Sequence, residues 1–294
     1  MTRSNTLRDW RRSLKDRLPY VRRRVHASLE RRYALLTDAL GMGVPRAADV
    51  TLTVVRPVRP GEADELCLFL SHQAAPTLKP HVVAHVTALL DRGVRVVLVL
   101  NTDLPAGTLR IDPALADRLD GLLVRQNLGY DFAGWAHAHA VVSPHLRAQR
   151  LYLVNDSIVG PLEAAAFDRM LARVRSSRAD VVGLIEAPTP RPHLQSFFLV
   201  FNTRAIAGGL EPFFREVLCF ADKGTVVDVY ETHLTQRLRQ AGLVCEAVFP
   251  SADPYGRWEQ LVADGFPFVK GRALAEHRQH PALERLVPPH LRVD

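Results

Sequence analysis

Three polar residues, Asn155, Asp156 and Ser157, follow directly on an apolar strand in the segment LYLVNDSIVGP (151–161). A carboxylate at the end of a buried strand can ligate Mg²⁺ or Mn²⁺ shared with a diphosphate, or it can bind a sugar hydroxyl directly. The alternative is that these residues only form an Asx turn after the strand, since such turns use the same residue types. The triplet therefore marks a candidate ligand site whose chemistry depends on its neighbours.

A second acidic group lies in DVYETHLTQRLRQAG (228–242), which has the pattern of an amphipathic helix closed by Gly242. Asp228 and Glu231 are three residues apart on its first turn and therefore share neighbouring surface. A carboxylate there can take the proton from an acceptor hydroxyl as a general base, a role worth ~10²–10⁴ in rate. Acidic residues also favour a helix N-terminus for electrostatic reasons alone, so both interpretations stay open.

Two further segments place polar side chains beside apolar strands. In NLGYDFAGW (127–135), Asp131 falls near a helix N-terminus, where it serves equally as a cap or as a ligand-binding carboxylate. HLQSFF (193–198) puts His193, Gln195 and Ser196 just before a strand, a density of polar groups that suits sugar hydroxyls. His193 serves equally as an ordinary loop residue, since no HxxxH or HExxH pattern accompanies it.

Several common chemistries lack their motifs. GxGxxG, GxxxxGK[ST] and GxSxG are all absent, which leaves a dinucleotide fold, a P-loop and the usual hydrolase turn unsupported. The three cysteines, Cys67, Cys219 and Cys245, are far apart and predict neither a zinc site nor a disulfide framework. No segment has signal-peptide character or the ~20 apolar residues of a membrane span, so a soluble or peripheral protein of the cytoplasm is expected.

Apolar strands and amphipathic helices alternate along the chain, which predicts an α/β fold with a mainly parallel sheet and flanking helices. Residues 65–71 and 94–102 have the pattern of buried strands joined by a crossover helix at 80–93, a βαβ unit. Further strands are expected at 120–127, 150–157, 179–187, 196–206 and 244–249. Further helices are expected at 131–142, 162–177, 211–222 and 227–241.

In such sheets, ligands bind beyond the carboxyl ends of the strands. The expected ends are polar in this chain: Ser71-His72, Asn101-Thr102, Gln126-Asn127 and Asn155-Asp156-Ser157. Turns favour the same residues, so this pattern adds only modest support for a site.

The positive charge is concentrated at the start of the chain. Residues 1–33 contain eleven basic and three acidic residues, which gives +8, whereas the whole chain has a formal net charge of +7. Apolar residues there recur at steps of three or four, which predicts a basic amphipathic helical segment over residues 1–45. Such a segment can lie on an anionic membrane, at about 1 kcal/mol per basic residue. Packing on the catalytic domain or on a second subunit is the equal alternative. Nucleic acid is disfavoured, because aromatic residues are not interleaved with the arginines.

Five segments taken together resemble the rhamnan synthesis protein F family: NLGYDFAGW, LYLVNDSIVGP, HLQSFFLVFN, the 228–242 helix and GFPFVK. The family patterns look like N-x-G-x-D-x-x-x-W, NDS-x-x-GP, QS-F and a late PF-x-K. The resemblance covers roughly residues 63–272, in order. The same segments are similar to the inverting glycosyltransferases of family 2, although Asn155-Asp156-Ser157 lacks the second carboxylate of the usual metal-binding motif.

The resemblance implies a GT-A-like catalytic domain at 46–272, between the basic segment 1–45 and a C-terminal tail at 273–294. It also implies a role in the assembly of rhamnose-containing polysaccharide or lipopolysaccharide. The implied reaction is inverting transfer of rhamnose or a similar sugar from a nucleotide-diphosphate donor to a glycan or lipid-linked glycan. The protein would then work in the cytoplasm, peripheral on the inner face of the cell membrane.

The resemblance also implies roles for individual residues. Glu231 would be the base, with Asp228 one turn earlier. Donor-binding residues would be Asn127, Asp131, Asn155, Asp156, Ser157 and Lys270, and residues near the sugar or acceptor would be His193, Gln195 and Ser196. A divalent cation, Mg²⁺ or Mn²⁺, would bind at Asp156. Two alternatives remain, namely a non-catalytic binding or assembly protein on the same scaffold, and a nucleotidyltransferase or sugar-nucleotide hydrolase.

Overall fold

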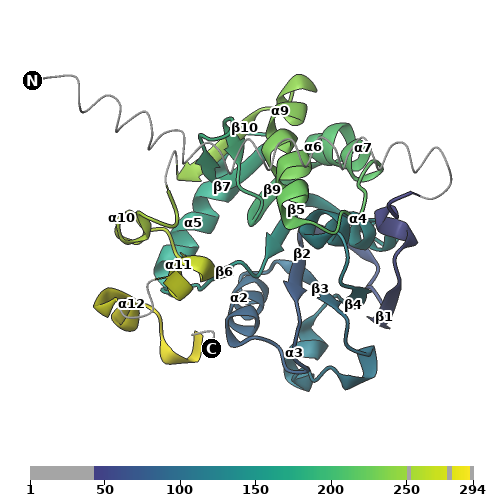
Figure 1. The fold of residues 1–294 in the computed structure, drawn as a ribbon, viewed down its shortest axis with the longest axis horizontal. Helices are drawn as coiled ribbons and strands as arrows, with labels where there is room; N and C mark the ends of the chain where they lie inside the picture. Colours follow the sequence, from purple (N-terminus) through teal and green to yellow (C-terminus); the bar gives the residue numbers. More distant parts are fainter. Residues whose placement is uncertain (1–42, 250–252, 277–279, 292–294) are drawn as a thin grey trace, which may run out of the picture.

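The computed structural model describes residues 43–249, 253–276 and 280–291, so nearly all of the predicted basic segment lies outside the described residues. A nine-stranded sheet runs through the molecule (Figure 1), in the order β1-β4-β3-β2-β5-β9-β7-β10, with β8 paired to β7. The strands are β1 (Leu52–Arg56), β2 (Gly61–His72), β3 (Arg95–Thr102), β4 (Gly121–Gln126), β5 (Leu146–Asn155), β7 (Val181–Ala187), β8 (His193–Leu194), β9 (Phe198–Asn202) and β10 (Cys245–Phe249).

The four strands β4, β3, β2 and β5 are neighbours and run parallel. Their register aligns His72 with Asn101 and Leu70 with Asn155, so the polar strand ends meet at one edge of the sheet. Strand β9 lies antiparallel between β5 and β7, which makes the sheet mixed on that side. The predicted α/β class and the βαβ unit at the start of the sheet are confirmed.

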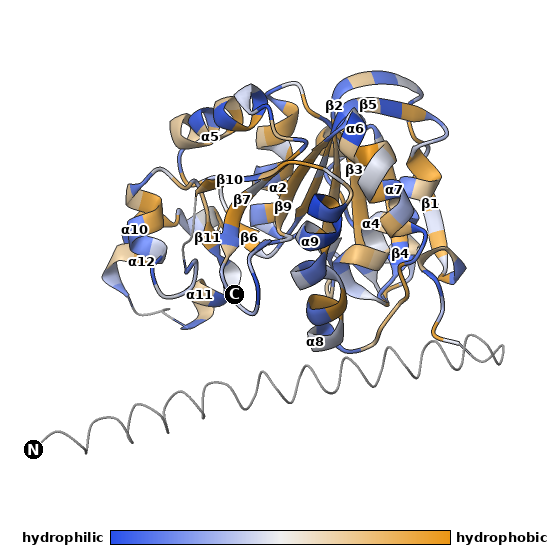
Figure 2. Cartoon of the chain, turned by 90° about the horizontal axis from the view of Figure 1, so that it is seen from above, coloured by the Kyte–Doolittle hydropathy of each residue, from blue (hydrophilic) through white to orange (hydrophobic). Residues whose placement is uncertain are grey.

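Helices cover both faces of this sheet. On one face lie α2 (Pro80–Leu90), α3 (Pro113–Arg118) and α5 (Ala164–Ser176); on the other lie α4 (Tyr130–Val142), α6 (Thr203–Ala205), α7 (Glu211–Phe214) and α9 (Thr232–Gln240). Side chains alternate between the two cores along β2, with Leu68 and Leu70 on the α4 side and Phe69 on the α2 side. Figure 2 accordingly shows hydrophobic strands enclosed between helices of mixed character.

Two expected elements in this region end earlier than the sequence suggested. The strand expected at 196–206 ends at Asn202, because the Asn202 side chain accepts a hydrogen bond from the Ala205 amide and caps α6. The helix expected at 211–222 both begins and ends earlier, because consecutive helical turns run from Thr203 to Phe214.

The C-terminal part of the chain forms a small lobe beside α2 (Figure 1). It contains α10 (Trp258–Ala263), β11 (Val269–Lys270), α11 (Gly271–Glu276), α12 (Pro281–Leu286) and η5 (Pro289–Leu291), and β11 pairs with β6 (Ile158–Val159). Leu283, Val287 and Leu291, from the segment that we expected to be a tail, are buried in its apolar cluster. Among the described residues, no helix combines the length and the apolar character needed to cross a membrane.

Candidate functional site

The carboxylate of Asp156 lies at the centre of the polar edge of the sheet. Its Oδ2 accepts hydrogen bonds from the Ser71 hydroxyl at 2.8 Å and the His72 amide at 3.1 Å. The Lys79 ammonium, directly before α2, lies 2.6 Å from the same oxygen. A charged residue at the end of one strand is thus held by groups from a neighbouring strand and from the crossover helix.

Asn155 links this centre to the neighbouring α4. Its Nδ2 donates to Asp131 Oδ2 at 2.8 Å, and its Oδ1 accepts from the Ser157 amide at 3.0 Å. The second bond is the Asx turn that the local interpretation predicted, but it uses Asn155, so the side chain of Asp156 is not part of the turn. The turn and the ligand site therefore coexist in the triplet.

The start of α4 is built so that Asp131 reaches Asn155. Gly129 and Tyr130 both have left-handed backbones, with φ of 81° and 54°. A Cβ at Gly129 would lie 2.6 Å from Ala133 Cβ and 2.7 Å from Cys219 Cα, so only glycine fits this turn. The indole of Trp135 donates to the buried Leu68 carbonyl and fixes the helix on the sheet. Asp131 thus bonds a side chain across the site.

Electrostatics at Asp131 connect it with the rest of the site. Burial, together with the charges of Asp156 and Glu231, raises the pKa of its carboxyl to about 6, although Lys223 and the hydrogen bond from Asn155 act in the opposite direction. Carboxylates that oppose one another in this way are typical of functional sites.

Glu231 belongs to a turn of π-helix, η4 (Val227–Glu231), between α8 (Lys223–Val226) and α9. Its Oε1 accepts hydrogen bonds from the amide and the hydroxyl of Ser196, at 2.9 and 3.1 Å. Asp228 is buried on the same turn, and its carbonyl accepts from the Thr232 hydroxyl. Single π-turns within helices are frequent at functional sites.

The helix that carries these carboxylates begins earlier than predicted. Asp222 caps it by accepting from the Thr225 amide at 2.7 Å, so helical structure starts at Lys223 and not at residue 227. The prediction that Asp228 and Glu231 lie on its first turn was wrong. The favourable helix dipole acts within the first turn, so it does not account for Glu231.

Lys270 enters the site from the C-terminal lobe, because β11 pairs Lys270 with Ile158 next to the triplet. Its ammonium donates to Ser157 Oγ at 3.2 Å and lies 3.9 Å from the centre of the Phe197 ring. Burial lowers the pKa of Lys270 to about 8, and the carboxylates of Glu231 and Asp131 oppose this shift.

The remaining predicted residues lie around this centre. Asn127 is half-buried at the bend after β4. His193 is buried in β8, and its Nδ1 lies 2.8 Å from the Arg191 carbonyl within the same loop. Gln195 Oε1 is buried and has no hydrogen-bond partner among the described residues, which leaves an acceptor beside Ser196.

Sequence reasoning missed four residues at this edge. Ser71 was predicted only as a polar strand end, while Lys79, His81 and Lys223 were not predicted to belong to the site. His81 Nε2 lies 3.1 Å from the Asp156 carbonyl. The available signal was the position of Lys79 and Lys223 at helix starts, since helices begin at the ligand-binding edge of an α/β sheet.

The groups around Asp156 do not fit a divalent cation. Its Oδ2 already accepts three hydrogen bonds, one of them from an ammonium, so at most one carboxylate oxygen remains for a cation. In the part of the chain that the structure describes, no group of three or more His, Cys, Asp or Glu side chains is placed to hold a metal ion. Mg²⁺ is usually held by one or two carboxylates together with water and substrate phosphates, and here Asp156 would supply at most one oxygen that is not already hydrogen-bonded.

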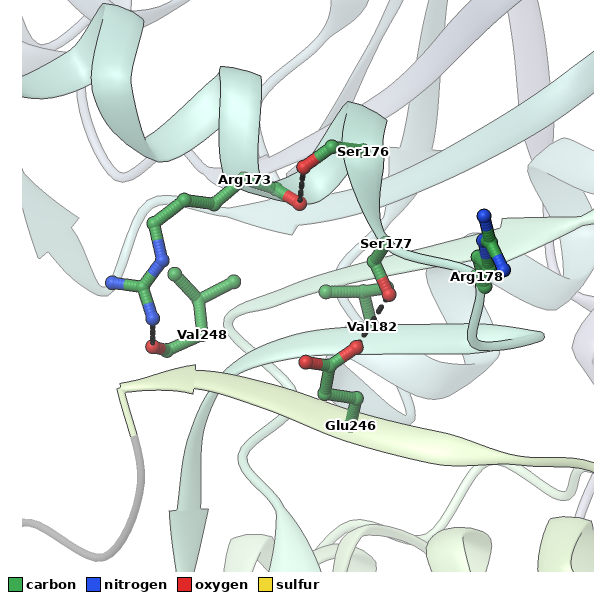
Figure 3. A pocket seen from close by; sticks show the side chains of 7 residues that line it. All are labelled: Arg173, Ser176, Ser177, Arg178, Val182, Glu246 and Val248. Atoms are coloured by element: carbon green, nitrogen blue, oxygen red, sulfur yellow. Dashed lines mark hydrogen bonds between the residues drawn. The ribbon is translucent and has the colours of Figure 1, made fainter.

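A separate pocket of about 370 Å³ lies at the opposite edge of the sheet, where β7 and β10 begin (Figure 3). It is lined by Arg173, Ser176, Ser177, Arg178, Val182, Glu246 and Val248. Arg173 donates to the Val248 carbonyl and Ser177 donates to Glu246, so its polar groups bond one another. None of these lining residues belongs to the site around Asp156.

Comparisons with known proteins agree with the motifs. A family model described as rhamnan synthesis protein F matches residues 96–286, which confirms the resemblance found in the sequence. An uncharacterized protein, y4gN, from Sinorhizobium fredii is 26% identical over 210 residues, which cover 68% of this chain and 52% of that protein. The virulence protein VirA of Vibrio anguillarum is 26% identical over 153 residues, which cover 50% of this chain and 48% of that protein.

This chain therefore spans about half the length of these relatives. Among solved structures, the crystal structure of a mycobacterial protein matches 76% of both chains, with 11% identity and a TM-score of 0.40. A match at that level supports no inference about the fold or the function.

Proposed function

Because the chain belongs to the rhamnan synthesis protein F family, we propose that it is an inverting glycosyltransferase of polysaccharide or lipopolysaccharide synthesis. The donor would be a nucleoside diphosphate sugar, rhamnose or a similar one, and the acceptor a glycan or a lipid-linked glycan. The observation that carries the proposal is the convergence of Asp131, Asp156, Glu231 and Lys270 at the carboxyl edge of a parallel sheet.

The donor would bind between the strand-end triplet and the C-terminal lobe. Lys270 offers an ammonium for the diphosphate, and Ser157, which accepts its hydrogen bond, positions it. Asp131 and Asn155 offer polar groups for the sugar or the nucleoside. Fixed charges that face a departing diphosphate stabilise the charge that develops on it, which is the largest part of such catalysis.

Glu231 would act as the general base. The two hydrogen bonds from Ser196 engage only Oε1, so Oε2 is available to an acceptor hydroxyl. The proton of that hydroxyl passes to Glu231 while its oxygen bonds to the anomeric carbon. The bond from that carbon to the diphosphate breaks on the opposite side, and the nucleoside diphosphate leaves.

The test combines binding with turnover. A thermal-shift screen of nucleotide sugars on the full chain should find at least one that stabilises the protein, because ligands that bind only the native state raise its stability. Glu231→Gln should keep that stabilisation and lose transfer by roughly 10²-fold or more. Glu216→Gln is the matched control, since Glu216 is exposed and pairs with Arg237 away from the site.

The alternatives predict different outcomes. If no nucleotide sugar or nucleoside diphosphate stabilises the protein, the proposed donor site does not exist. If Glu231→Gln leaves the polysaccharide of the cell unchanged, the chain is a binding or assembly protein on this scaffold. Release of a nucleoside monophosphate from a nucleotide sugar without an acceptor would indicate a hydrolase, and release of diphosphate from a nucleoside triphosphate and a sugar phosphate would indicate a nucleotidyltransferase.

A further inference from the structure

Lysine is rare in this chain, and its distribution follows the candidate site. Of the 38 basic residues, only Lys15, Lys79, Lys223 and Lys270 are lysines. Lys15 lies outside the described residues. Elsewhere on the described surface arginine makes the ion pairs with acidic residues, for example Arg92 with Asp168 and Arg118 with Asp91. Because this chain uses arginine for its solvated charges, we expect its few lysines at positions where a compact ammonium serves better than a planar guanidinium.

Lys79 has the closest contact with the strand-end carboxylate. Its Nζ lies 2.6 Å from Asp156 Oδ2, with side-chain exposures of 30% for Lys79 and 14% for Asp156. The Lys79 side chain is therefore partly accessible to a ligand, while the Asp156 side chain is largely covered. In a metal-dependent site, a divalent cation lies between such a carboxylate and the diphosphate.

The other two lysines approach the same centre from other elements. Lys270 reaches Ser157 from β11, on the side of the C-terminal lobe. Lys223 is the exposed first residue of α8. Helix α8 contacts α4, which carries Asp131, and the Lys223 charge lowers the pKa of both Asp131 and Lys270. Three separate elements thus supply three ammonium groups around one strand end.

We propose that Lys79, Lys223 and Lys270 together bind the diphosphate of the donor without a divalent cation. Lys79, held by Asp156, takes the position that the cation would have. This inference rests on the proposed function and specifies its ligand as a nucleoside diphosphate held by ammonium groups. An ammonium suits this role because it is a point charge with three donors and can bond the carboxylate and a phosphate oxygen at once.

The first experiment removes metal. Titration calorimetry on the full chain, with uridine, guanosine and thymidine diphosphates as probes, is carried out in EDTA and again with Mn²⁺. The affinity for the nucleotide that binds should agree within about twofold between the two conditions. Binding that appears only with Mn²⁺, or that tightens about tenfold with it, overturns this inference and leaves the proposed function standing.

The second experiment removes each ammonium. Lys79→Met, Lys223→Met and Lys270→Met should each weaken diphosphate binding by about tenfold or more, and weaken monophosphate binding less, because charge-assisted hydrogen bonds are lost. Arg118→Met, on the far surface, should not change the affinity. Wild-type affinity in all three lysine variants contradicts the proposed diphosphate site.

A double variant separates the ammonium from its partner. Lys79→Met leaves Asp156 unpaired, so Lys79→Met with Asp156→Asn restores neutrality at the same place. The double variant should bind as weakly as Lys79→Met alone. Full recovery in the double variant would show that Lys79 only neutralises Asp156, which overturns its role as a ligand. Failure of every nucleoside diphosphate to bind wild type, with or without Mn²⁺, counts against the proposed function itself.

Discussion

Asp131 is a carboxylic acid in surroundings that disfavour its ionised form. Burial and the neighbouring charges of Asp156 and Glu231 raise its pKa from 3.8 to about 6. The folded state therefore binds the proton more tightly than the unfolded chain does, so stability falls as the pH rises from about 4 to about 6 and stays lower above that. A structural role alone would favour a neutral side chain, so this cost agrees with a functional carboxylate.

Asp131→Asn should raise the melting temperature near pH 7 and have little effect near pH 4, where the wild-type carboxyl is protonated. The amide keeps an oxygen that can accept the hydrogen bond from Asn155. Each kcal/mol gained corresponds to roughly 2–4 °C in a protein of this size. Thermal unfolding at both pH values measures the effect, with the exposed Asp103→Asn as control. An equal gain at both pH values would contradict the assignment.

Lys270 should set an upper pH limit for diphosphate binding. Because burial lowers its pKa to about 8, the ammonium loses its proton as the pH rises above that value. Affinity for a nucleoside diphosphate should then fall by up to tenfold per pH unit. Lys270→Arg, which stays charged, should lack this decline. Calorimetry between about pH 7 and pH 9.5 tests both, and a flat wild-type profile would refute the prediction.

At the scale of elements, the site depends on how closely α4 lies on the sheet. Trp135 bonds the Leu68 carbonyl of β2, and Gly134 sits directly over Leu70 of the same strand. A Cβ at Gly134 would lie 2.1 Å from Leu70 Cδ1 and 3.2 Å from Asn101 Nδ2. The absence of a side chain there lets the helix approach, which brings Asp131 within reach of Asn155.

Gly134→Ala should therefore destabilise the protein by about 1–3 kcal/mol, although alanine is the better helix former by about 1 kcal/mol. The clash pushes α4 away from β2, so donor affinity should fall as well. Gly208→Ala is the control, because a Cβ at Gly208 would meet no atom within 4 Å and its backbone is not left-handed. Urea unfolding compares the two variants. Equal stabilities would show that Leu70 yields without cost.

At the scale of the whole molecule, the C-terminal lobe fixes two parts of the site. Strand β11 carries Lys270 to the triplet, and η5 packs against α2, whose start holds Lys79. The cluster of the lobe includes Val159 next to the triplet and half-buried Ala84 on α2. Two of the three lysines therefore depend on residues far from them in the sequence.

Leu291→Ala should lower the free energy of unfolding by about 2–5 kcal/mol and also weaken binding of a nucleoside diphosphate. Leu291 is buried in η5, with 1% exposure, and its loss leaves a cavity beside α2. Val244→Ala, at a side chain with 60% exposure, should change neither quantity. Normal affinity in a destabilised Leu291→Ala would show that the lobe contributes to the fold but not to the site.

The basic segment at the start of the chain remains a prediction. Deletion of residues 1–42 should abolish binding to anionic liposomes, since each basic residue near the surface contributes about 1 kcal/mol. The deletion stops there because the Pro45 carbonyl accepts a hydrogen bond from the Cys219 amide and Ala47 is buried. Its melting temperature should match that of the full chain. Retained liposome binding would favour the protein contact that the sequence left as the alternative.

The sequence by itself determined the α/β class, the strands that carry Ser71 and Asn101, the strand that ends just before Asp156, and the ordered motifs of the family. These follow from local patterns, because buried strands and amphipathic helices have different periodicities and strands end at polar residues. The cap at Asp222 was also a local signal, and it shows that the earlier helix start could have been recognised.

Only the tertiary structure decided which polar residues meet. Lys270 and Ser157 are 113 positions apart, and the pairing of β6 with β11 brings them together. Lys79 reaches Asp156 because α2 packs on the sheet, and Glu231 reaches Ser196 because the helix from Lys223 lies against β8. Such long-range pairings form because the whole chain buries its apolar surface in one fold. A local stretch of sequence does not contain the total apolar area that is buried, so it does not reveal the pairings.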